Sequence, residues 1–245
     1  MHSWKNSLRR SWYTLRGLWL YGHTRHCPLC SGSFRHFLPK GEPLRAEAMC
    51  PRCLSLERHR AQWLLLHREH VLEGSASILH FAPEPGIRDR LRALPGVLYV
   101  TADIAPGRAD TAMDMTRLAF RAQSFDRLLC SHVLEHVADD AAAMRELYRV
   151  LRPGGIAVLQ VPLREGPTDE DLSVTDPGER LRRFGQEDHV RFYGRDDFMN
   201  RLQAAGFTVR ALSPTAGLTG AEIERGRLLD SAEGDDRVFL AHRER

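Results

Sequence analysis

Residues 124–162 read SFDRLLCSHVLEHVADDAAAMRELYRVLRPGGIAVLQVP, and their pattern predicts a strand, a helix and a second strand. Residues 125–130 and residues 156–161 are apolar runs of strand length. Between them, residues 139–151 carry apolar side chains at the spacing of one helix face, with acidic residues at the N-terminal end. The Pro-Gly-Gly sequence at 153–155 is expected to end this helix.

Two strands joined by a helix with short connections predict a parallel pair with a right-handed crossover. In such sheets the ligand binds outside the carboxyl ends of the strands. Residues at the carboxyl ends of the two strands are therefore expected to flank a cleft: Ser131, His132, Glu135 and His136 on one side, and Gln160 and Pro162 on the other.

Several pieces of this stretch occur together in one large enzyme family. SFDRLLCSHVLEHV, LYRVLRPGG and the strand that follows resemble the class I S-adenosylmethionine-dependent methyltransferases, in particular the type 11 group. The resemblance extends over residues 77–243, about two-thirds of the chain. It implies an α/β fold: a Rossmann-like, mostly parallel seven-stranded sheet with an antiparallel last strand. It also implies a methyltransferase that uses S-adenosylmethionine as the methyl donor.

The chain divides by composition into an N-terminal part and a larger catalytic part. The expected divisions are a basic, Trp-rich segment at 1–26, a four-cysteine module at 27–53, a connecting helix at 54–76, and a methyltransferase domain at 77–245 with a substrate lid at 163–195. A polar segment as long as this lid, between a strand and the next helix, usually carries function or is disordered.

Bulk composition indicates a globular protein with a full core. Of 245 residues, 42% are hydrophobic, and the mean hydropathy is −0.38. No apolar run approaches the roughly 20 residues that span a bilayer, and no secretory signal is recognised. The expected location is cytoplasmic, with peripheral contact at the inner face of the membrane as an alternative. The net charge of +3 is too small to argue for nucleic acid by itself.

Four of the five cysteines form two C-x2-C pairs, Cys27-Pro-Leu-Cys30 and Cys50-Pro-Arg-Cys53, separated by nineteen residues. Each pair can turn two thiolates toward one point, and two pairs complete a tetrahedral site of the structural zinc type. Bound Zn²⁺ would contribute folding energy that so small a module cannot obtain from a core. An iron–sulfur site, redox thiols and a vestigial site without metal are the alternatives.

The N-terminal segment is amphipathic at helical spacing. Its apolar residues Trp4, Leu8, Trp12, Leu15 and Trp19 share one helical face, and basic residues lie among them. Such a helix could lie in a membrane interface. The alternative is a helix packed on the rest of the protein, with its arginines solvated.

The turn after the first strand of the methyltransferase domain departs from the family pattern. The strand is expected at 78–82, followed by the turn in HFAPEPG and a short helix at 87–94. By resemblance, Phe81, Ala82, Glu84 and Gly86 line the cofactor, yet Gly86 is the only glycine retained. Glu84 either meets the ammonium group of the cofactor or is solvated.

The second strand, expected at 98–102, ends at an acidic residue that fits the ribose. Asp103 lies seventeen residues beyond the turn glycine, where a carboxylate can accept hydrogen bonds from both ribose hydroxyls. A cap or turn aspartate is the alternative. By resemblance, Ile104 adjoins the same ligand, Asp114 meets the adenine amino group and Met115 lies along the ring. Two further residues, Ser131 and His132, then lie next to the methionine part and the sulfonium.

The lid and the turn after the fourth strand supply the acceptor-side candidates. His189 is the leading candidate for a general base, because imidazole titrates near neutral pH, and a structural role is an equal alternative. His132 is the second catalytic candidate. The expected substrate-binding residues are His136, Asp188, Arg191 and Tyr193.

Residues 132–136 also spell H-x-x-E-H, an inverted zinc-protease signature. That chemistry needs both histidines on an established helix and a further carboxylate. Here the motif starts directly at a strand end, so protease activity is not predicted.

The methyl acceptor is less defined than the donor. No N/D-P-P-Y/F motif is present, which argues against methylation of the adenine amino group. O- or N-methylation of a small molecule or a cell-envelope glycan or lipid-linked acceptor is favoured over RNA, because residues 27–53 carry few basic side chains. An rRNA-type methyltransferase that grips RNA through its zinc module and a non-catalytic cofactor-binding scaffold are the alternatives. The oligomeric state is not predicted.

Overall fold

The computed structural model describes residues 2–228 and 237–245, and the side chains from residue 11 onward within those ranges. The chain forms two compact units. The N-terminal unit falls within residues 1–72, 84–93 and 214–230, and the sheet unit within 73–83, 94–213 and 231–245. The units therefore interleave along the sequence, which differs from the consecutive divisions expected above. Each unit is described separately.

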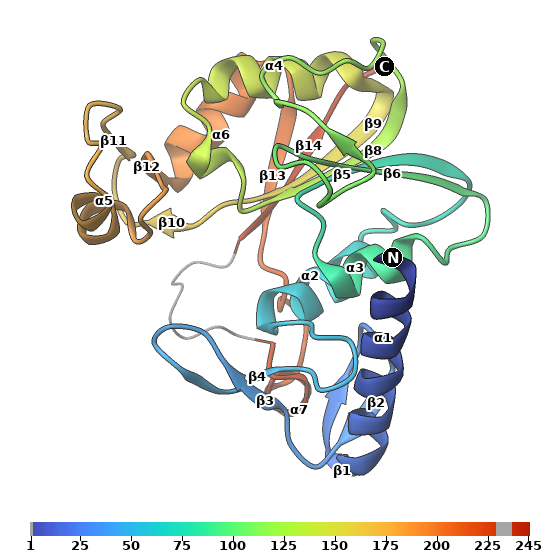
Figure 1. Ribbon diagram of the computed structural model, residues 1–245. Coiled ribbons are helices and arrows are strands. Elements are labelled where there is room, and N and C mark those ends of the chain that lie inside the picture. Colours follow the sequence, from blue (N-terminus) through green and yellow to red (C-terminus); the bar gives the residue numbers. More distant parts are fainter. Residues whose placement is uncertain (1, 229–236) are drawn as a thin grey trace. The chain divides into compact units, whose positions relative to one another are not determined.

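The sheet unit is built on seven strands in the order β13-β14-β9-β8-β5-β6-β7 (Figure 1). The strand β14 pairs antiparallel with both of its neighbours, whereas the pairs on the β9 to β7 side are all parallel. This is the predicted fold class, including the antiparallel last strand. The strands are β5 (Ala76–Phe81), β6 (Val97–Asp103), β7 (Thr111–Ala112), β8 (Phe125–Ser131), β9 (Leu151–Gln160), β13 (Thr208–Leu212) and β14 (Val238–His242).

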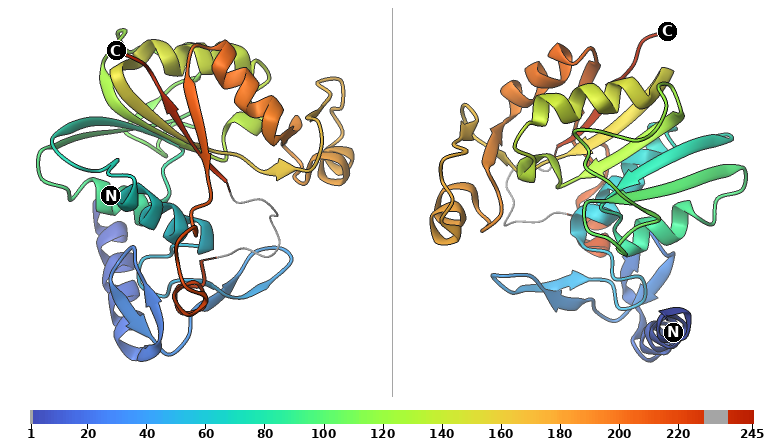
Figure 2. Two further views of the ribbon diagram at one scale, coloured as in Figure 1. Left: turned by 180° about the vertical axis from the view of Figure 1, so that it is seen from behind. Right: turned by 45° about the horizontal axis from the view of Figure 1, so that its top comes forward.

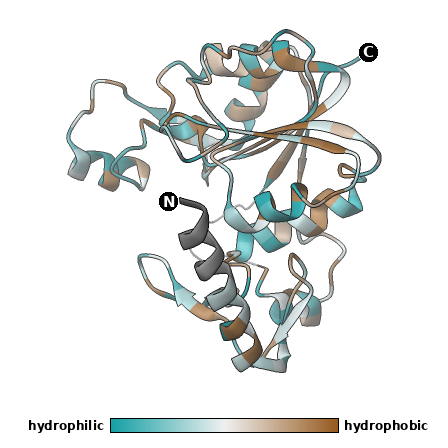
Figure 3. Ribbon diagram, turned by 45° about the vertical axis from the view of Figure 1, so that its right-hand side comes forward, coloured by the Kyte–Doolittle hydropathy of each residue, from teal (hydrophilic) through white to brown (hydrophobic). Residues whose placement is uncertain are grey.

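Helices α4 (Asp140–Val150) and α6 (Arg195–Ala204) lie on one face of this sheet (Figure 1). Asp139 caps α4 by accepting the N–H of Ala142 at 2.8 Å. The apolar face of α4 is fully buried against the strands, whose hydrophobic residues are visible in Figure 3. The core between these layers includes Leu128, Met144, Leu147, Leu159, Phe198 and Phe239.

The Pro-Gly-Gly sequence does not terminate α4, which corrects the prediction. The helix ends because Leu151 turns to extended backbone and begins β9 at once. Residues 153–155 lie within β9, where the pairing with β8 shifts register. Gly154 has a φ of +79° and donates its N–H to the carbonyl of Arg243 at 2.7 Å. The glycines therefore make a bulge in the strand.

An ionic cluster joins the amino ends of β5 and β8. Asp126 accepts the N–H and the hydroxyl of Ser77, each at 2.7 Å, and pairs with Arg152 at 2.8 Å. Burial alone would raise the pKa of Asp126, but the bonds from Ser77 and Arg152 outweigh it and lower that pKa to about 2. The charged form of the carboxyl thus stabilises the fold.

Asp126→Asn should lower the free energy of unfolding at pH 7 by about 1–3 kcal/mol, because charged hydrogen bonds are lost. The depressed pKa means that the wild-type advantage is complete above 3.8 and is lost as the pH falls towards 2. Denaturant unfolding of both proteins between these limits should show the two free energies converging. A difference that is constant with pH would contradict the assignment, and Asp196→Asn, on an exposed carboxylate, is the control.

The segment predicted as a lid is ordered. It contains β10 (Leu163–Arg164), β11 (Asp169–Glu170), α5 (Pro177–Phe184) and β12 (Arg191–Gly194). The three strands form their own small sheet in the order β10-β12-β11. Figure 2 shows this segment as a separate lobe at the edge of the main sheet. The lobe adjoins the 3-10 turn η1 (Leu134–His136) after β8, since the N–H of Val190 donates to the carbonyl of Glu135 at 3.0 Å.

The N-terminal unit combines the cysteine module with four helices. Its elements are α1 (His2–Trp19), β1 (Tyr21–Cys27), β2 (Gly32–Phe34), β3 (Leu38–Lys40), β4 (Arg45–Met49), α2 (Glu57–Arg68), α3 (Pro85–Leu91) and α7 (Gly220–Gly226). The strands pair as two antiparallel hairpins, β1-β2 and β3-β4.

Arg60 holds this unit together. Its side chain is fully buried, and its guanidinium donates to the carbonyls of Ala48 and Ser55 in the cysteine module. The same group donates to the carbonyls of Gly226 and Arg227 at 2.7 Å each. These bonds explain why a segment more than 150 residues away in sequence belongs to the N-terminal unit.

Helix α1 contacts the second cysteine pair but leaves an apolar face uncovered within its own unit. Arg16 donates two hydrogen bonds to the carbonyl of Pro51, at 2.9 and 2.7 Å. Trp12 and Trp19 are 62% and 79% exposed, and Leu15 is 60% exposed. Figure 3 shows hydrophobic residues in brown near the C-terminal end of this helix. The packing alternative placed the arginines in solvent and the apolar face inside, whereas among the described side chains Arg16 bonds to Pro51, and Trp12, Leu15 and Trp19 are exposed.

Candidate active site and four-cysteine centre

The carboxyl ends of β5, β6, β8 and β9 lie along one edge of the sheet. Phe81 pairs with both Ala102 and Cys130, and Ser131 pairs with Gln160. Residues that directly follow these strands are therefore neighbours along that edge, where ligands of parallel sheets bind.

Two of these residues have left-handed backbone without being glycine. Ala82 has a φ of +43° and His132 a φ of +54°, a region that costs most residues about 1–2 kcal/mol. Each is held by its neighbouring strand: the N–H of Ala82 donates to Ala102 and that of His132 to Gln160, both at 2.8 Å. Ala82 occupies a position where the family that the sequence resembles usually has glycine, and it adopts a glycine-like conformation. The altered turn has therefore kept a sharp bend directly after β5.

Asp103 ends β6 with an intermediate exposure and one occupied oxygen. Its Oδ1 accepts the N–H of Ala105 at 2.8 Å, and among the described residues no partner is found for Oδ2. The next side chain, Ile104, is 77% exposed. A free carboxylate oxygen beside an exposed apolar side chain suits a ribose and the ring attached to it.

The adenine-side candidates lie after β7. Asp114 is exposed, and its Oδ1 accepts both the N–H and the hydroxyl of Thr116 at 2.8 Å. Met115 is 4% exposed and belongs to the core cluster under the sheet edge. Ser131 is 6% exposed at the end of β8. Met115 and Ser131 thus line the floor of this edge, and Asp114 lies at its surface.

Glu84 and Gly86, the other cofactor candidates, belong to the N-terminal unit. Glu84 precedes α3, and its Oε1 lies 4.0 Å from Nε2 of His59. A Cβ built on Gly86 would approach Leu29 to 2.7 Å and the carbonyl of Cys53 to 3.1 Å. Gly86 is therefore required for close packing of α3 on both cysteine pairs, a reason that the family pattern did not suggest.

Three histidine side chains on the acceptor side converge around a buried carboxylate. Glu135 is 1% exposed, with Nδ1 of His132 at 3.5 Å and Nε2 of His189 at 4.0 Å from its Oε1. The rings of His136 and His189 meet edge to face, with centroids 4.6 Å apart. The Nδ1 atom of His189 lies 2.9 Å from the carbonyl of Phe184. Burial lowers the pKa of His189, which keeps the ring neutral near pH 7.

Glu135 was predicted to flank the cleft, but no catalytic or binding role was predicted for it. The signal that could have found it is the H-x-x-E-H motif read together with His189 from the lid. Of the two candidate bases, His132 is the more accessible, with 18% side-chain exposure against 3% for His189.

Arg191 was predicted to hold a substrate anion, but its donors are used inside the fold. Its side chain is fully buried, and it donates to the carbonyls of Leu134, Val137 and Ala138 around η1. It also pairs with Glu170. This geometry favours a role in positioning the turn over direct contact with an acceptor.

Tyr193 and Asp188 differ sharply in accessibility. Tyr193 is fully buried and donates its hydroxyl to Asp140 at 2.7 Å, and burial raises the pKa of its phenol. Asp188 has 71% side-chain exposure, with a carboxylate oxygen 3.3 Å from Nδ1 of His136. Of the four predicted substrate-binding residues, His136 and Asp188 are the two that an acceptor could reach.

The four paired cysteines form one cluster in the N-terminal unit. All four Sγ atoms lie within 4.8 Å of one another, with Cys27 to Cys53 at 3.6 Å and Cys30 to Cys50 at 3.7 Å. Tetrahedral geometry with metal–sulfur bonds of about 2.3 Å requires sulfur–sulfur distances of about 3.8 Å. The cluster therefore fits a tetrahedral metal ion. Burial raises the pKa of Cys50, so a cation is needed for all four sulfurs to be thiolates.

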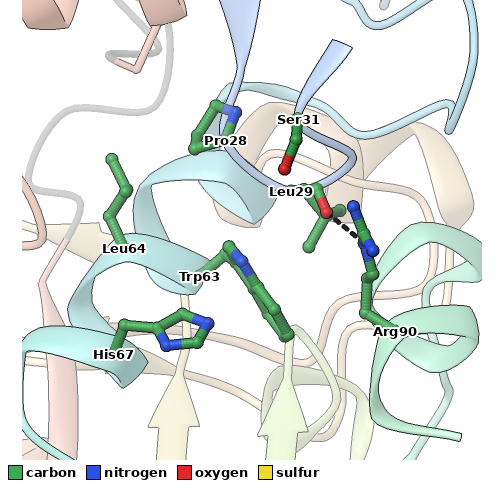
Figure 4. A pocket seen from close by; sticks show the side chains of 7 residues that line it. All are labelled: Pro28, Leu29, Ser31, Trp63, Leu64, His67 and Arg90. Carbon is green, nitrogen blue, oxygen red and sulfur yellow. Dashed lines mark hydrogen bonds between the residues drawn. The ribbon is translucent and has the colours of Figure 1, made fainter. Parts of the chain in front are cut away.

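A pocket of about 320 Å³ lies beside the first cysteine pair (Figure 4). Arg90 of α3 crosses one side and donates to the carbonyl of Leu29. Trp63 and His67 of α2 form another side, with ring centroids 4.8 Å apart. All lining residues belong to the N-terminal unit, and none is a predicted donor-site or acceptor-site residue: Pro28, Leu29, Ser31, Trp63, Leu64, His67 and Arg90.

Several solved structures share the fold. The (4+2)-cyclase SpnF is 16% identical, with a TM-score of 0.52, over 76% of this chain and 82% of that one. The 1,6-didemethyltoxoflavin-N1-methyltransferase of Burkholderia thailandensis, with S-adenosylhomocysteine bound, is 14% identical, with a TM-score of 0.51, over 77% and 79% of the two chains. Phosphoethanolamine N-methyltransferase 2 of Haemonchus contortus, solved with S-adenosyl-L-methionine, is 15% identical, with a TM-score of 0.51, over 76% and 53%. Identities this low establish the fold alone.

Sequence comparison is more specific. Demethylmenaquinone methyltransferases of Streptomyces griseus and Streptomyces avermitilis are each 41% identical over 64 residues, or 26% of this chain. This match spans only 28% of the length of each relative. The family described as a methyltransferase domain matches residues 60–212, more than half of the chain. The chain therefore belongs to the methyltransferase domain family, the class I S-adenosylmethionine-dependent methyltransferases.

Proposed function

We propose that this protein transfers the methyl group of S-adenosylmethionine to an oxygen or nitrogen atom of a small-molecule, glycan or lipid-linked acceptor. The observation that carries the proposal is the placement, along one sheet edge, of Asp103 after β6 and His132 after β8. Asp103 would accept hydrogen bonds from the ribose, with Ile104 against the adenine and Asp114 near its amino group. Ser131 and the bend at Ala82 would lie beside the methionine part.

The chemistry requires alignment and proton removal. When bound, S-adenosylmethionine supplies a methyl group that is already activated on sulfur. For a hydroxyl acceptor, the new O–C bond forms as the S–C bond breaks, and the hydroxyl proton passes to a base. His132 is the candidate that can touch the acceptor, and Glu135 at 3.5 Å would stabilise its protonated form. His189 is too deeply buried to serve as this base, with 3% side-chain exposure.

A small acceptor is favoured over RNA for two reasons. The Streptomyces relatives are named for demethylmenaquinone, a small molecule. In the N-terminal unit, Arg45 pairs with Glu57 at 3.4 Å and Arg25 pairs with Glu47. These pairs remove positive charge from a module that would need a basic face to grip RNA.

Calorimetric titration of the zinc-replete protein with S-adenosylmethionine and S-adenosylhomocysteine tests the donor site. Saturable binding of both compounds at one site per chain is expected. If neither compound binds, alone or with candidate acceptors, the non-catalytic scaffold alternative replaces the enzyme. If binding is found, the acceptor search should begin with quinones and glycan intermediates and end with RNA.

We also propose that the four-cysteine cluster holds a structural Zn²⁺ ion. The sulfur–sulfur distances support a tetrahedral site, and four thiolates complete the coordination without an open position. The ion would fix both cysteine pairs, and through Gly86 the helix α3, in one arrangement.

The exposed face of α1 supports a third proposal, contact with an anionic membrane surface. Among the described residues, no helix has the length and apolar character needed to cross a membrane. Replacing both Trp12 and Trp19 with glutamate should reduce sedimentation with anionic lipid vesicles at least about tenfold, because two interfacial anchors are lost. Glutamate replacements at exposed Leu172 and Leu181, in the sheet unit, are the control. Unchanged sedimentation would refute membrane contact.

A further inference from the structure

Glu135 is a buried carboxylate whose position the fold alone does not explain. Both of its oxygens are buried and have no hydrogen-bond partner within the described part of the chain. A buried carboxylate without compensation costs several kcal/mol, and proteins usually pair it or bind a metal ion to it. Three histidines surround Glu135, so the group that compensates its negative charge is expected on the side of these histidines.

His189 faces this carboxylate with its Nε2 atom. Its Nδ1 lies 2.9 Å from the carbonyl of Phe184, which can only accept, so Nδ1 carries the proton. In the neutral ring, Nε2 then carries a lone pair, and it lies 4.0 Å from Oε1 of Glu135. This Nε2 atom is also buried and unpartnered among the described residues. A cation that contacts both atoms would satisfy the two unpartnered groups at once.

His136 completes the set. Three possible ligand atoms lie within 4.8 Å of one another: a ring nitrogen of His136, a ring nitrogen of His189 and an oxygen of Glu135. The Nδ1 atom of His136 faces the carboxylate of Asp188 at 3.3 Å, as the Nδ1 atom of His189 faces a carbonyl. Histidines that bind metals usually donate their second ring nitrogen to a carboxylate or a backbone carbonyl in this way.

The surrounding structure preorganises these three groups. Glu135 and His136 belong to η1, and Arg191 holds the carbonyls on both sides of that turn. Val190 donates its N–H to the carbonyl of Glu135 at 3.0 Å, which fixes the lid residue next to His189 against the same turn. The site is therefore braced by buried hydrogen bonds rather than placed on an exposed loop.

We propose that Glu135, His136 and His189 bind a divalent transition-metal ion, distinct from the ion of the four-cysteine cluster. Two imidazoles and one carboxylate are a donor set typical of Zn²⁺, Fe²⁺ or Mn²⁺ sites with open coordination positions. The partly exposed His132 lies at the rim of the site, since its Nδ1 is 3.5 Å from Glu135.

This site deepens the proposed function, on which its catalytic role rests. An open position would hold an acceptor oxygen, so the substrate class would be hydroxyl compounds that can chelate a metal through neighbouring oxygens. The metal would lower the pKa of the bound hydroxyl, and His132 would receive its proton. Binding of the metal itself requires neither donor nor acceptor.

Cobalt titration of the metal-free full chain separates the two sites. Co²⁺ in the four-cysteine cluster gives intense thiolate-to-metal charge-transfer bands, whereas Co²⁺ bound by nitrogen and oxygen does not. We expect two equivalents per chain, one of each spectral type. Cys27→Ser with Cys30→Ser should abolish only the first type, and Glu135→Gln only the second.

His189→Asn adds a variant that keeps the hydrogen bond to Phe184, because its amide nitrogen can replace Nδ1, while it removes Nε2. In Glu135→Gln and His189→Asn the second equivalent should weaken by more than the roughly 10–100-fold typical of losing an outer-shell partner. Glu146→Gln, a partly buried carboxylate on α4 that pairs with Arg149, should leave it unchanged.

A single equivalent with only thiolate bands, up to millimolar Co²⁺, would overturn the proposal, as would a second equivalent that survives both variants. In that case the compensation for Glu135 is a protonated histidine. Binding of S-adenosylhomocysteine, measured in parallel, shows whether each variant is folded. It also separates the proposals: metal without cofactor binding refutes only the enzyme function, and cofactor without metal binding refutes only this site.

Discussion

Asp103→Ala is expected to weaken binding of S-adenosylmethionine by about 100-fold or more while the fold is retained. A carboxylate that accepts two ribose hydroxyls contributes charged hydrogen bonds of about 1.5–3 kcal/mol each. Asp103 is partly exposed at the end of β6, and the only hydrogen bond of its side chain among the described residues holds the backbone of Ala105. Replacing Asp103 should therefore weaken cofactor binding far more than it destabilises the core. Calorimetry with the cofactor and thermal unfolding without it measure the two effects separately.

Two further variants sharpen this test. Asp103→Asn can still accept the N–H of Ala105 through its amide oxygen, so any loss of affinity in this variant reports on the ribose and not on the turn. Asp196→Ala removes an exposed carboxylate that pairs only with its neighbour Arg195 at 2.9 Å, and it should bind the cofactor normally. If Asp103→Ala keeps wild-type affinity, the ribose assignment is wrong, and Asp103 is a turn residue.

The sheet was predictable because its signals are local. Each buried strand is a short apolar run, and the apolar residues of α4 recur at helical spacing with an aspartate cap at its start. The predicted strand at 125–130 differs from β8 by one residue. The end of α4 was predicted within one residue, but the start of β9 at Leu151 was missed. Pro-Gly-Gly is an equally good signal for a bulge, and only pairing with β8 and Arg243 decides between a turn and a bulge.

Features that depend on long-range packing were not predictable. Gly86 was assigned to the cofactor because a glycine after the first strand usually approaches a ligand, whereas here it admits Leu29 and Cys53. Arg191 has the composition of an anion-binding residue, and only its burial against the turn after β8 gives it a structural role. Glu135 was predicted to flank the cleft but was given no role, because that role depends on His189, 54 residues away in sequence.

The largest effect on stability is expected from Cys27→Ser combined with Cys30→Ser. The double variant should lose one zinc equivalent, and in small zinc modules metal binding supplies on the order of 10 kcal/mol of folding free energy. Without the metal, the two hairpins and the close contact at Gly86 lose their common anchor. The N-terminal unit should then unfold at a lower temperature than the sheet unit. Zinc analysis of the purified protein measures the first effect.

The distribution of tryptophan makes the earlier unfolding of the N-terminal unit measurable in the intact chain. All four tryptophans fall within the N-terminal unit, and Trp63 is only 7% exposed there. Tryptophan fluorescence therefore reports on that unit, while cofactor affinity reports on the sheet unit. We expect a red-shifted emission and a lower unfolding temperature by fluorescence in the double variant. Cys130→Ser, at a buried cysteine of β8, should keep the zinc and the emission maximum. Full zinc content with an unchanged emission maximum in the double variant would show that the cysteines are not the metal ligands. Loss of zinc without any change in emission would show that the metal does not hold this unit together.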